Sequence, residues 1–341
     1  MKAMVLNNLC NLNENQAPLE LLEIPVPVPA ENEILLKVST CGVCHTELDE
    51  IEGRTPPPKL PVVLGHQVVG LVEAIGSKVI TIKAGDRVGV AWIFSACGKC
   101  KFCLSDHENL CRDFKATGRD ANGGYAQYMV VAEHFAYAIP EFFSDESAAP
   151  LLCAGAIGYR SLQLTGLQNG QHLGLTGFGA SGHLVLKMAK HRYPDSKVFV
   201  FARNAAERKF ALELGAVWAG DSKEQAPCKL DCIIDTTPAW EPVVEALANL
   251  DSGGRLVINA IRKEGDKRSL LNLDYPLHLW QEKEIKSVAN ITRRDVTEFL
   301  DMAAAMELQP EIQVFPLEQA NHALLEMKSG KIRGAKVLKI E

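Results

Sequence analysis

Short apolar runs separated by turn residues dominate roughly the first 150 residues of the chain. These runs are rich in Val and Ile, which favour strands, and turns containing Gly and Pro, such as Pro56–Pro58, divide them. The pattern predicts a β-rich region with strands at Ile34–Ser39, Val68–Ile75, Asp86–Val90 and Tyr125–Val131.

Beyond residue 150, strand-like and helical patterns alternate. Strands are predicted at His172–Thr176, Lys197–Ala202, Ala216–Ala219, Cys232–Asp235 and Arg255–Ala260, and helices at Ser181–Lys190, Ala205–Gly215 and Trp240–Leu250. This βαβ alternation is typical of a doubly wound parallel sheet. It ends near residue 288, after which a helix at Asp295–Met306 and a strand at Lys336–Ile340 are predicted. The chain is therefore expected to be an α/β protein with more than one domain.

Composition and charge narrow the functional class. The 341 residues carry 36 Lys and Arg against 42 Asp and Glu, a formal net charge of −6. Nucleic acid and anionic membranes are therefore not expected as partners, because both call for a basic face. The N-terminus has no signal-peptide pattern, and the long charge-free run Ser161–Leu186 contains too many polar residues and glycines for a membrane span. We expect a cytoplasmic protein.

A glycine-rich turn lies between the predicted strand His172–Thr176 and the helix that follows it. Gly177, Gly179 and Gly182, with Phe178, Ala180 and Ser181 between them, form the pattern G-x-G-x-x-G. The first glycine allows the tight turn, the second lets a pyrophosphate approach the backbone, and the third lets helix and strand pack closely. The turn predicts a dinucleotide site, and the alternative is a purely structural turn.

The residues after the second predicted strand bear on which dinucleotide binds. An acidic residue is expected there for the ribose 2′-hydroxyl of NAD, but the chain reads Ala202-Arg203-Asn204, and the next acid, Glu207, lies in the following helix. A missing carboxylate beside Arg203 favours the 2′-phosphate of NADP. In the alternative, Arg203 points to solvent and Asn204 serves the ribose of NAD. We predict a slight preference for NADP and use of both cofactors.

Four closely spaced cysteines are the most specific metal signal in the chain: Cys97, Cys100, Cys103 and Cys111. Four thiolates within one short segment can enclose a tetrahedral Zn²⁺ and leave no position open, which defines a structural site. The alternative is an iron–sulfur cluster, but the seven-residue gap before Cys111 and the absence of a following proline disfavour it.

A second group of possible ligands is scattered along the chain. Cys41 and Cys44 form a C-x-x-C pair, His66 follows Gly65, and Cys153 stands alone. Spacing alone cannot join these residues. A redox pair at Cys41 and Cys44, or simple packing of a lone His or Cys, remains open at this stage.

Several longer segments together resemble a known family. CGVCHTELDEIEG, LGHQVVGLVEAIG, AGDRVGVAW, the four-cysteine segment, NGGYAQYMVV, APLLCAGAIGYRSL and TGFGASG occur in this order. The series resembles the zinc-dependent alcohol dehydrogenases of the medium-chain dehydrogenase/reductase superfamily, most closely the branch of yeast-type and bacterial tetrameric enzymes. It implies a GroES-like β-rich catalytic domain over 1–150 and 288–341, with a structural zinc lobe at 95–113, and a Rossmann domain over 151–287.

The resemblance also implies roles for individual residues. Cys44, His66 and Cys153 would bind a catalytic zinc with one open position, which makes two zinc ions per subunit. Thr46 would bond the substrate oxygen and start the proton path, and Glu47 would orient His66. His45 would lie near the cofactor pyrophosphate, and Trp92 would line the substrate pocket.

Three positions depart from the family pattern. Gln67 replaces the Glu that usually follows the zinc histidine, and Asp49 replaces a His that is common in the proton relay. We expect Asp49 to be the relay carboxylate, and the alternative is a solvated surface residue. Near the C-terminus the phosphate-contacting Arg is displaced, so Arg333 or Lys336 would take its place.

The implied activity is the reversible oxidation of primary or secondary alcohols to aldehydes or ketones, with hydride transfer to NAD(P)⁺. The resemblance also implies a homo-oligomer, either a tetramer or a dimer. Two alternatives come from other classes. One is a zinc-free reductase of the same superfamily that acts on activated double bonds, and the other is a non-enzymatic cofactor-binding protein.

Overall fold

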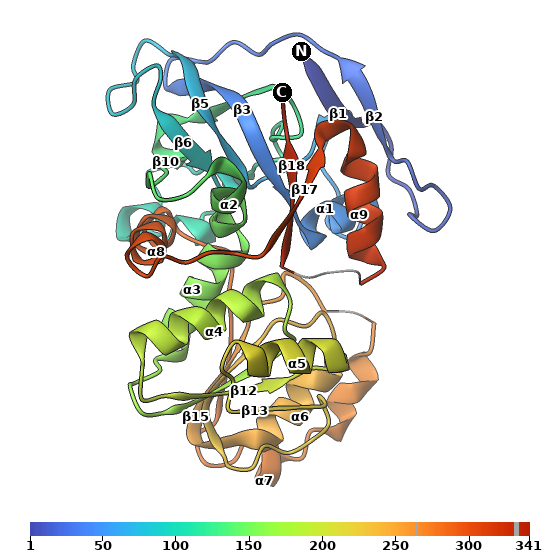
Figure 1. The fold of residues 1–341 in the computed structure, drawn as a ribbon, viewed down its shortest axis with the longest axis vertical. Coiled ribbons are helices and arrows are strands. Elements are labelled where there is room, and N and C mark those ends of the chain that lie inside the picture. The colour runs from blue at the N-terminus through green and yellow to red at the C-terminus, as the bar shows by residue number, and fades with distance from the viewer. Residues whose placement is uncertain (264, 331–333) are drawn as a thin grey trace. The chain divides into compact units, whose positions relative to one another are not determined.

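The computed structural model describes residues 1–263, 265–330 and 334–341. Contacts between residues divide the chain into two compact units (Figure 1). The first comprises Met1–Ala156 and Ile291–Glu341, and the second comprises Ile157–Asn290. The second unit is therefore inserted, along the chain, into the first.

A large, mostly antiparallel sheet forms the framework of the first unit. Its strands run in the order β10-β6-β5-β3-β18-β17. On the side of β3 that faces β18, the first part of β3 pairs with β9 and the last part with β18. A second sheet has the order β2-β1-β4, and β7 pairs with β8. The strands are β1 (Lys2–Leu6), β2 (Leu19–Glu23), β3 (Glu33–Val43), β4 (Val62–Val63), β5 (Val68–Ile75), β6 (Arg87–Val90), β7 (Ile93–Ser95), β8 (Lys115–Ala116), β9 (Tyr128–Ala132), β10 (Ala136–Ala138), β17 (Ile312–Pro316) and β18 (Ala335–Lys339).

Short helices connect these strands. The start of α8 is fixed by a capping box in which Thr292 and Asp295 exchange hydrogen bonds of 2.7 and 3.1 Å. The helical elements are α1 (His45–Ile51), η1 (Cys103–Ser105), η2 (Glu108–Leu110), η3 (Glu133–Phe135), α2 (Asp145–Ala148), η4 (Ala149–Leu152), α8 (Arg293–Ala305), η6 (Leu317–Gln319) and α9 (Ala320–Lys328).

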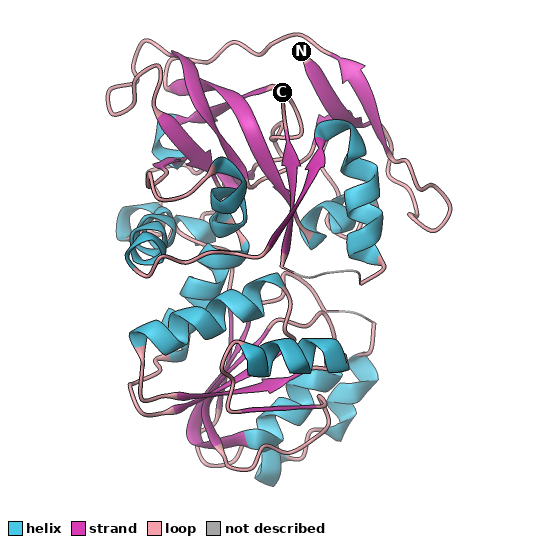
Figure 2. Cartoon of the chain, viewed as in Figure 1, coloured by secondary structure: helices cyan, strands magenta, loops and turns pink. Residues whose placement is uncertain are grey.

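The second unit combines strands and helices (Figure 2). Its sheet has six strands in the order β13-β12-β11-β14-β15-β16, and every pair is parallel. The strand order reverses between β11 and β14. The predicted doubly wound sheet is confirmed. Its elements are α3 (Ala154–Thr165), which crosses the boundary between the units, β11 (His172–Thr176), α4 (Ala180–Arg192), β12 (Lys197–Phe201), α5 (Ala205–Glu213), β13 (Trp218–Gly220), β14 (Leu230–Asp235), α6 (Glu241–Asn249), β15 (Leu250–Ile258), η5 (Lys267–Asn272), α7 (Tyr275–His278) and β16 (Glu284–Ser287).

Each unit has its own apolar core. In the first, buried residues of β1, β3, β5 and α9 form one cluster that includes Tyr125. In the second, Phe199, Ile233 and Leu247 bring β12, β14 and α6 into one cluster. Within the described residues, no helix combines the length and apolar character needed to cross a bilayer.

Candidate functional site

Three possible metal ligands converge in the first unit from three parts of the chain. Cys44 is the residue between β3 and α1, His66 precedes β5, and Cys153 follows η4. Their donor atoms all lie within 4.8 Å of one another. Cys153 Sγ is 3.3 Å from His66 Nε2 and 4.0 Å from Cys44 Sγ. The structure thus joins the scattered ligands that spacing alone could not join.

A carboxylate fixes the orientation of the imidazole. Glu47 is fully buried on α1, and its Oε1 lies 2.7 Å from His66 Nδ1. Its other oxygen, Oε2, accepts a hydrogen bond of 2.7 Å from the Cys44 backbone N–H. Because Nδ1 faces Glu47, Nε2 is directed at the two thiols, which is the usual arrangement behind a metal-binding histidine.

The charges of this group fit a divalent cation. The pKa of Cys44 lies well below its usual range because Cys153 donates a hydrogen bond to its sulfur, and the same bond raises the pKa of Cys153 well above its usual range. Burial lowers the pKa of His66, but Glu47 and Cys44 raise it by more, so it lies well above the usual value. A cation that replaced the protons on Cys153 and His66 would be held by two sulfurs and one imidazole nitrogen, a donor set of the kind that Zn²⁺ takes.

Other residues predicted for this site lie on α1. Thr46 is buried with its hydroxyl 3.5 Å from Cys44 Sγ, and His45 is exposed at the first position of the helix. Asp49 is 2% exposed, and Arg54 donates from Nε to its Oδ1 at 2.7 Å. The interpretation of Asp49 as a solvated surface carboxylate is therefore wrong, because an arginine covers it.

The remaining neighbours have structural surroundings. Cys41 is buried, its thiol donates to the Gly42 carbonyl, and it is not part of the ligand group. Burial raises its pKa well above the usual range, so a redox pair with Cys44 is not favoured. Gln67 is buried with its side chain over Gly42, where a Cβ would lie 2.7 Å from Oε1. Trp92 is half-buried and its ring packs against Phe114 with centroids 5.2 Å apart.

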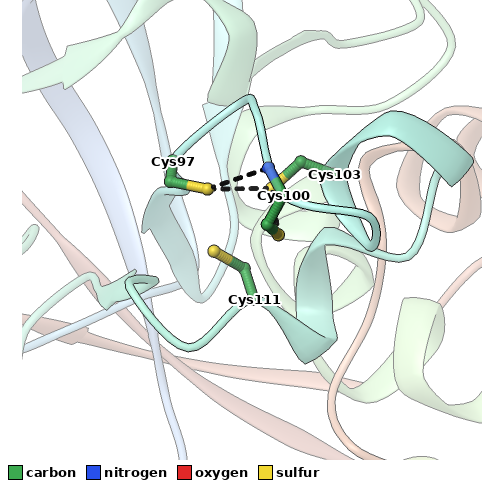
Figure 3. Close-up of side chains that lie close together, drawn as sticks. All are labelled: Cys97, Cys100, Cys103 and Cys111. Atoms are coloured by element: carbon green, nitrogen blue, oxygen red, sulfur yellow. Dashed lines mark hydrogen bonds between the residues drawn. The ribbon is translucent and has the colours of Figure 1, made fainter.

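The four-cysteine segment folds around one point (Figure 3). The four sulfurs of Cys97, Cys100, Cys103 and Cys111 lie within 4.8 Å of one another, and Cys103 Sγ is 3.6 Å from that of Cys100 and 3.8 Å from that of Cys97. Sulfurs bound to one tetrahedral Zn²⁺ lie about 3.8 Å apart, because each Zn–S bond is about 2.3 Å. This spacing fits a single ion better than a cluster in which each thiolate has its own iron.

Backbone N–H groups also favour the thiolate form of one of these cysteines. The N–H groups of Lys99 and Cys100 donate to Cys97 and lower the pKa of its thiol to about 6. Burial raises the pKa of Cys103 to about 12. A cation at the centre would compensate that burial, as in closed structural sites.

In the second unit, the glycine-rich turn has the three properties expected of a dinucleotide site. Gly177 has φ +80°, and a Cβ there would lie 2.7 Å from Thr236 Oγ1. A Cβ on Gly182 would lie 2.8 Å from the Gly177 carbonyl oxygen, so the third glycine permits close packing. At Gly179, the N-cap of α4, nothing lies within 4 Å of a Cβ. Ala180 and Ser181 begin α4 there, so open space adjoins a helix N-terminus that can receive phosphate.

The turn after β12 brings together one acid and two arginines. Arg203 is exposed, and Asn204 caps α5 by accepting 2.8 Å from the Ala206 N–H. Glu207 is half-buried; burial raises its pKa, while Arg203 and a hydrogen bond from the Phe178 N–H lower it. Arg208 donates to the carbonyls of Ala202 and Arg203 at 2.7 and 2.9 Å.

Sequence reasoning did not use Arg208, and it set Glu207 aside because Glu207 lies within a helix. The signal that could have found them is their position in the first turns of α5, the helix that follows β12 after a three-residue turn. Arg333 lies outside the described residues. Lys336 is buried, and its ammonium group donates to Glu326 at 2.6 Å and to Gln313 at 2.7 Å.

A GroES-like unit and a parallel dinucleotide-binding sheet define a class of two-domain oxidoreductases. The alcohol dehydrogenase GroES-like domain matches residues 30–141. "Probable alcohol dehydrogenase AdhA" of Mycobacterium tuberculosis (strain CDC 1551 / Oshkosh) is 43% identical over 95% of this chain and 93% of that protein. An alcohol dehydrogenase of Geobacillus stearothermophilus is 33% identical over 97% of this chain and 98% of that protein. The solved cinnamyl alcohol dehydrogenase SbCAD4 of Sorghum bicolor is 27% identical, with a TM-score of 0.83 over 99% of this chain and 97% of that chain.

The chain belongs to the alcohol dehydrogenases of the medium-chain dehydrogenase/reductase superfamily. The family predicted from the sequence motifs is confirmed. The narrower placement in the tetrameric branch stays a prediction.

Proposed function

We propose that the protein is a zinc-dependent alcohol dehydrogenase that reversibly oxidises primary or secondary alcohols to aldehydes or ketones with NAD(P)⁺. The observation that carries the proposal is the pairing of a three-donor site with a separate four-donor site. Three protein ligands leave a coordination position for a substrate, whereas four close the site. The first unit would be the catalytic domain, 1–150 with 288–341, and the second the dinucleotide-binding domain, 151–287.

In this proposal, separate groups of residues hold the metal ion, hold the cofactor and accept the proton. Cys44, His66 and Cys153 would hold a Zn²⁺, which supplies a Lewis acid, and the Gly177–Gly182 turn would hold a nicotinamide dinucleotide, which supplies a hydride acceptor. Glu47 keeps His66 Nε2 directed at the thiols. The Thr46 hydroxyl, beside Cys44, accepts the proton that leaves the substrate hydroxyl group. We also propose that His45 lies near the pyrophosphate and that Trp92 lines the substrate pocket.

Elemental analysis and an absorbance assay at the nicotinamide band, with a panel of primary and secondary alcohols and both cofactors, test this function. We expect two zinc ions per chain and cofactor reduction that chelation abolishes. Turnover of activated double bonds that survives chelation would favour the zinc-free reductase. A protein that binds cofactor and turns over none of these substrates would favour a non-enzymatic role.

We expect the substitution Asp49→Asn to shift the pH–rate profile of alcohol oxidation and to lower the rate. Asp49 would be the carboxylate that accepts the proton released by the Thr46 hydroxyl, and an amide cannot accept it. The matched control is Glu52→Gln, which removes a second carboxylate bonded to Arg54. A profile that moves equally in both variants would assign the effect to Arg54 and exclude a relay role for Asp49.

We propose that both cofactors are used, with a slight preference for NADP. Arg203 and Arg208 favour a 2′-phosphate, and Glu207 beside Phe178 opposes one. A charge-assisted bond contributes about 1.5–3 kcal/mol, so Arg203→Ala should lower the NADP-to-NAD ratio of kcat/KM about tenfold.

The control for that substitution is Lys209→Ala, which removes an exposed cation from α5, the helix that follows Arg203. Ala202→Asp should favour NAD, and Glu207→Gln should favour NADP. A ratio that Arg203→Ala does not alter would exclude a role for Arg203.

We propose a homo-oligomer in which a second copy pairs along β16, the last strand of the parallel sheet. All four of its residues are exposed, and Tyr275, Trp280 and Ile285 leave apolar surface nearby, 60%, 56% and 45% exposed. Ile285→Glu should therefore reduce the mass measured by light scattering to that of a smaller species. Ile80→Glu, which adds the same charge at an 85% exposed isoleucine of the first unit, should leave the mass unchanged. A monomeric wild-type protein would contradict the proposal.

We place the protein in the cytoplasm. Support comes from its ten cysteines, which are all free. Clustered free thiols that hold metal are typical of a reducing compartment.

A further inference from the structure

The second unit contains a buried ion pair outside the groups described above. Asp235, the last residue of β14, is fully buried, and the side chain of Lys263 is 9% exposed. The Lys263 ammonium group donates to Asp235 Oδ2, to the Thr237 carbonyl at 2.9 Å and to the Ala239 carbonyl at 3.0 Å. An ammonium group has three donors, so every donor of Lys263 is committed to residues 235–239.

The same carboxylate fixes the end of β11. Asp235 Oδ1 accepts hydrogen bonds of 2.7 Å from the hydroxyl groups of both Thr176 and Thr237. The Thr236 N–H donates to the Thr176 carbonyl at 2.9 Å. Thr176 immediately precedes Gly177, and a Cβ on Gly177 would lie 2.7 Å from Thr236 Oγ1. The loop 236–240 therefore packs directly against the first glycine of the turn.

The far end of this loop is held from the same segment as Lys263. Asp266 accepts hydrogen bonds from the Trp240 N–H at 2.9 Å and from the Glu241 N–H at 3.0 Å. The Lys263 ammonium group also lies over the Trp240 ring, 5.8 Å from its centroid. Both ends of the loop are therefore fixed by residues that follow β15.

The position of the loop in the sheet gives this arrangement its function. In doubly wound sheets, ligands bind at the carboxyl ends of the strands where the strand order reverses, which is here between β11 and β14. The two loops at that point are the glycine-rich turn after β11 and the loop 236–240 after β14. We infer that Asp235 and Lys263 form a positioning clamp that holds the loop 236–240 against the glycine-rich turn and so preorganises the dinucleotide site.

This inference rests on the proposed cofactor site. A loop that is fixed before binding need not be ordered by the ligand, so the clamp raises affinity for the part of the dinucleotide common to NAD and NADP. The clamp residues are positioning residues, because all donors of Lys263 are bonded to the protein.

Fluorescence titration with NADH and NADPH tests the clamp. We expect Lys263→Met to raise the Kd of both cofactors by a similar factor, at least about tenfold, and the cofactor KM to rise more than kcat falls. The matched control is Lys283→Met, which removes an ammonium group bonded to the carbonyls of Leu247 and Leu277 at 3.1 and 2.9 Å. It should lower the Tm and leave both Kd values unchanged.

If the single variant does not fold, the double variant Asp235→Asn/Lys263→Met replaces it in the test, because it leaves no buried charge unpaired. It still lacks the donor for the two loop carbonyls, so it should show the same rise in Kd. Wild-type Kd values in either folded Lys263 variant would overturn the clamp. A wild-type protein that binds neither dinucleotide would overturn the proposed cofactor site, and the clamp with it.

Discussion

Replacing Cys44 with alanine should remove one of the two proposed zinc ions per chain and lower kcat/KM for alcohol oxidation by about a thousandfold or more. The proposed ion is held by three side chains, so the loss of one thiolate leaves only Cys153 and His66. Lewis-acid polarisation contributes several kcal/mol to such reactions, and about 4 kcal/mol corresponds to a thousandfold in rate. Elemental analysis and the absorbance assay measure the two effects, and circular dichroism checks that the fold is kept.

The chain offers a matched control three residues away. Cys41 is a fully buried thiol in the same segment that lies outside the ligand group, so Cys41→Ala removes the same atoms without removing a ligand. It should keep both zinc ions and most of the activity. His66→Ala should behave like Cys44→Ala. Equal losses of zinc from Cys41→Ala and Cys44→Ala would show that the ligands are wrongly assigned.

Replacing Cys100 with serine should remove the other proposed zinc ion and lower the free energy of unfolding by about 4 kcal/mol. The reason is that Cys97, Cys103 and Cys111 would then converge on a site without a fourth thiolate, and the segment would lose the ion that replaces an apolar core there. Thermal or denaturant unfolding measures the effect. The ion at Cys44, His66 and Cys153 should stay bound, so turnover at low temperature should fall much less than in Cys44→Ala.

Cys10→Ser is the control for this prediction, because Cys10 is a half-buried thiol of the same unit that belongs to neither ligand group. It should alter neither metal content nor stability by a comparable amount. Iron in place of zinc, or full metal content in Cys100→Ser, would contradict the assignment of a structural zinc site.

Elements with a strong local pattern could be predicted from the sequence. The strands Val68–Ile75 and His172–Thr176 occur at the predicted residues, and the helix predicted at Ser181–Lys190 occurs at Ala180–Arg192. In each case the apolar period and the adjacent turn residues agree. The strand predicted at Tyr125–Val131 begins later, at Tyr128. Tyr125 and Gln127 lie at bends, and this part of the chain pairs elsewhere: the Tyr125 N–H donates to the Leu64 carbonyl, and Ala126 bridges to Ala3.

Other elements lack such a pattern. The helix α3 contains Gly155 and Gly158, which disfavour a helix locally, and both pack closely against other side chains, Phe299 and Val185. The strand β16 is short and all four of its residues are exposed, so no alternation of buried and exposed residues marks it.

The two proposed metal sites also differ in how far they could be predicted, because one has a local sequence pattern and the other does not. Cys97 to Cys111 form a local pattern that chain spacing reveals. His66 and Cys153 are separated by 87 residues, and only the fold brings them together, so spacing alone left that site open. The burial of Lys263 and Asp235 is likewise a property of tertiary packing and leaves no mark in the sequence.

The insertion of one unit into the other has a consequence for folding during synthesis. The strand β3 leads into Cys44, and next to Cys44 its last residue, Val43, pairs with Lys336 of β18. A nascent chain therefore completes the parallel sheet before the C-terminal part of β3 has its neighbour β18, although all three proposed zinc ligands have already been synthesised. Contacts this distant in sequence form late because the loop they close is long. On the ribosome the dinucleotide unit should become protease-resistant first, and the three ligands should become a high-affinity zinc site only after residues 335–339 have emerged from the exit tunnel.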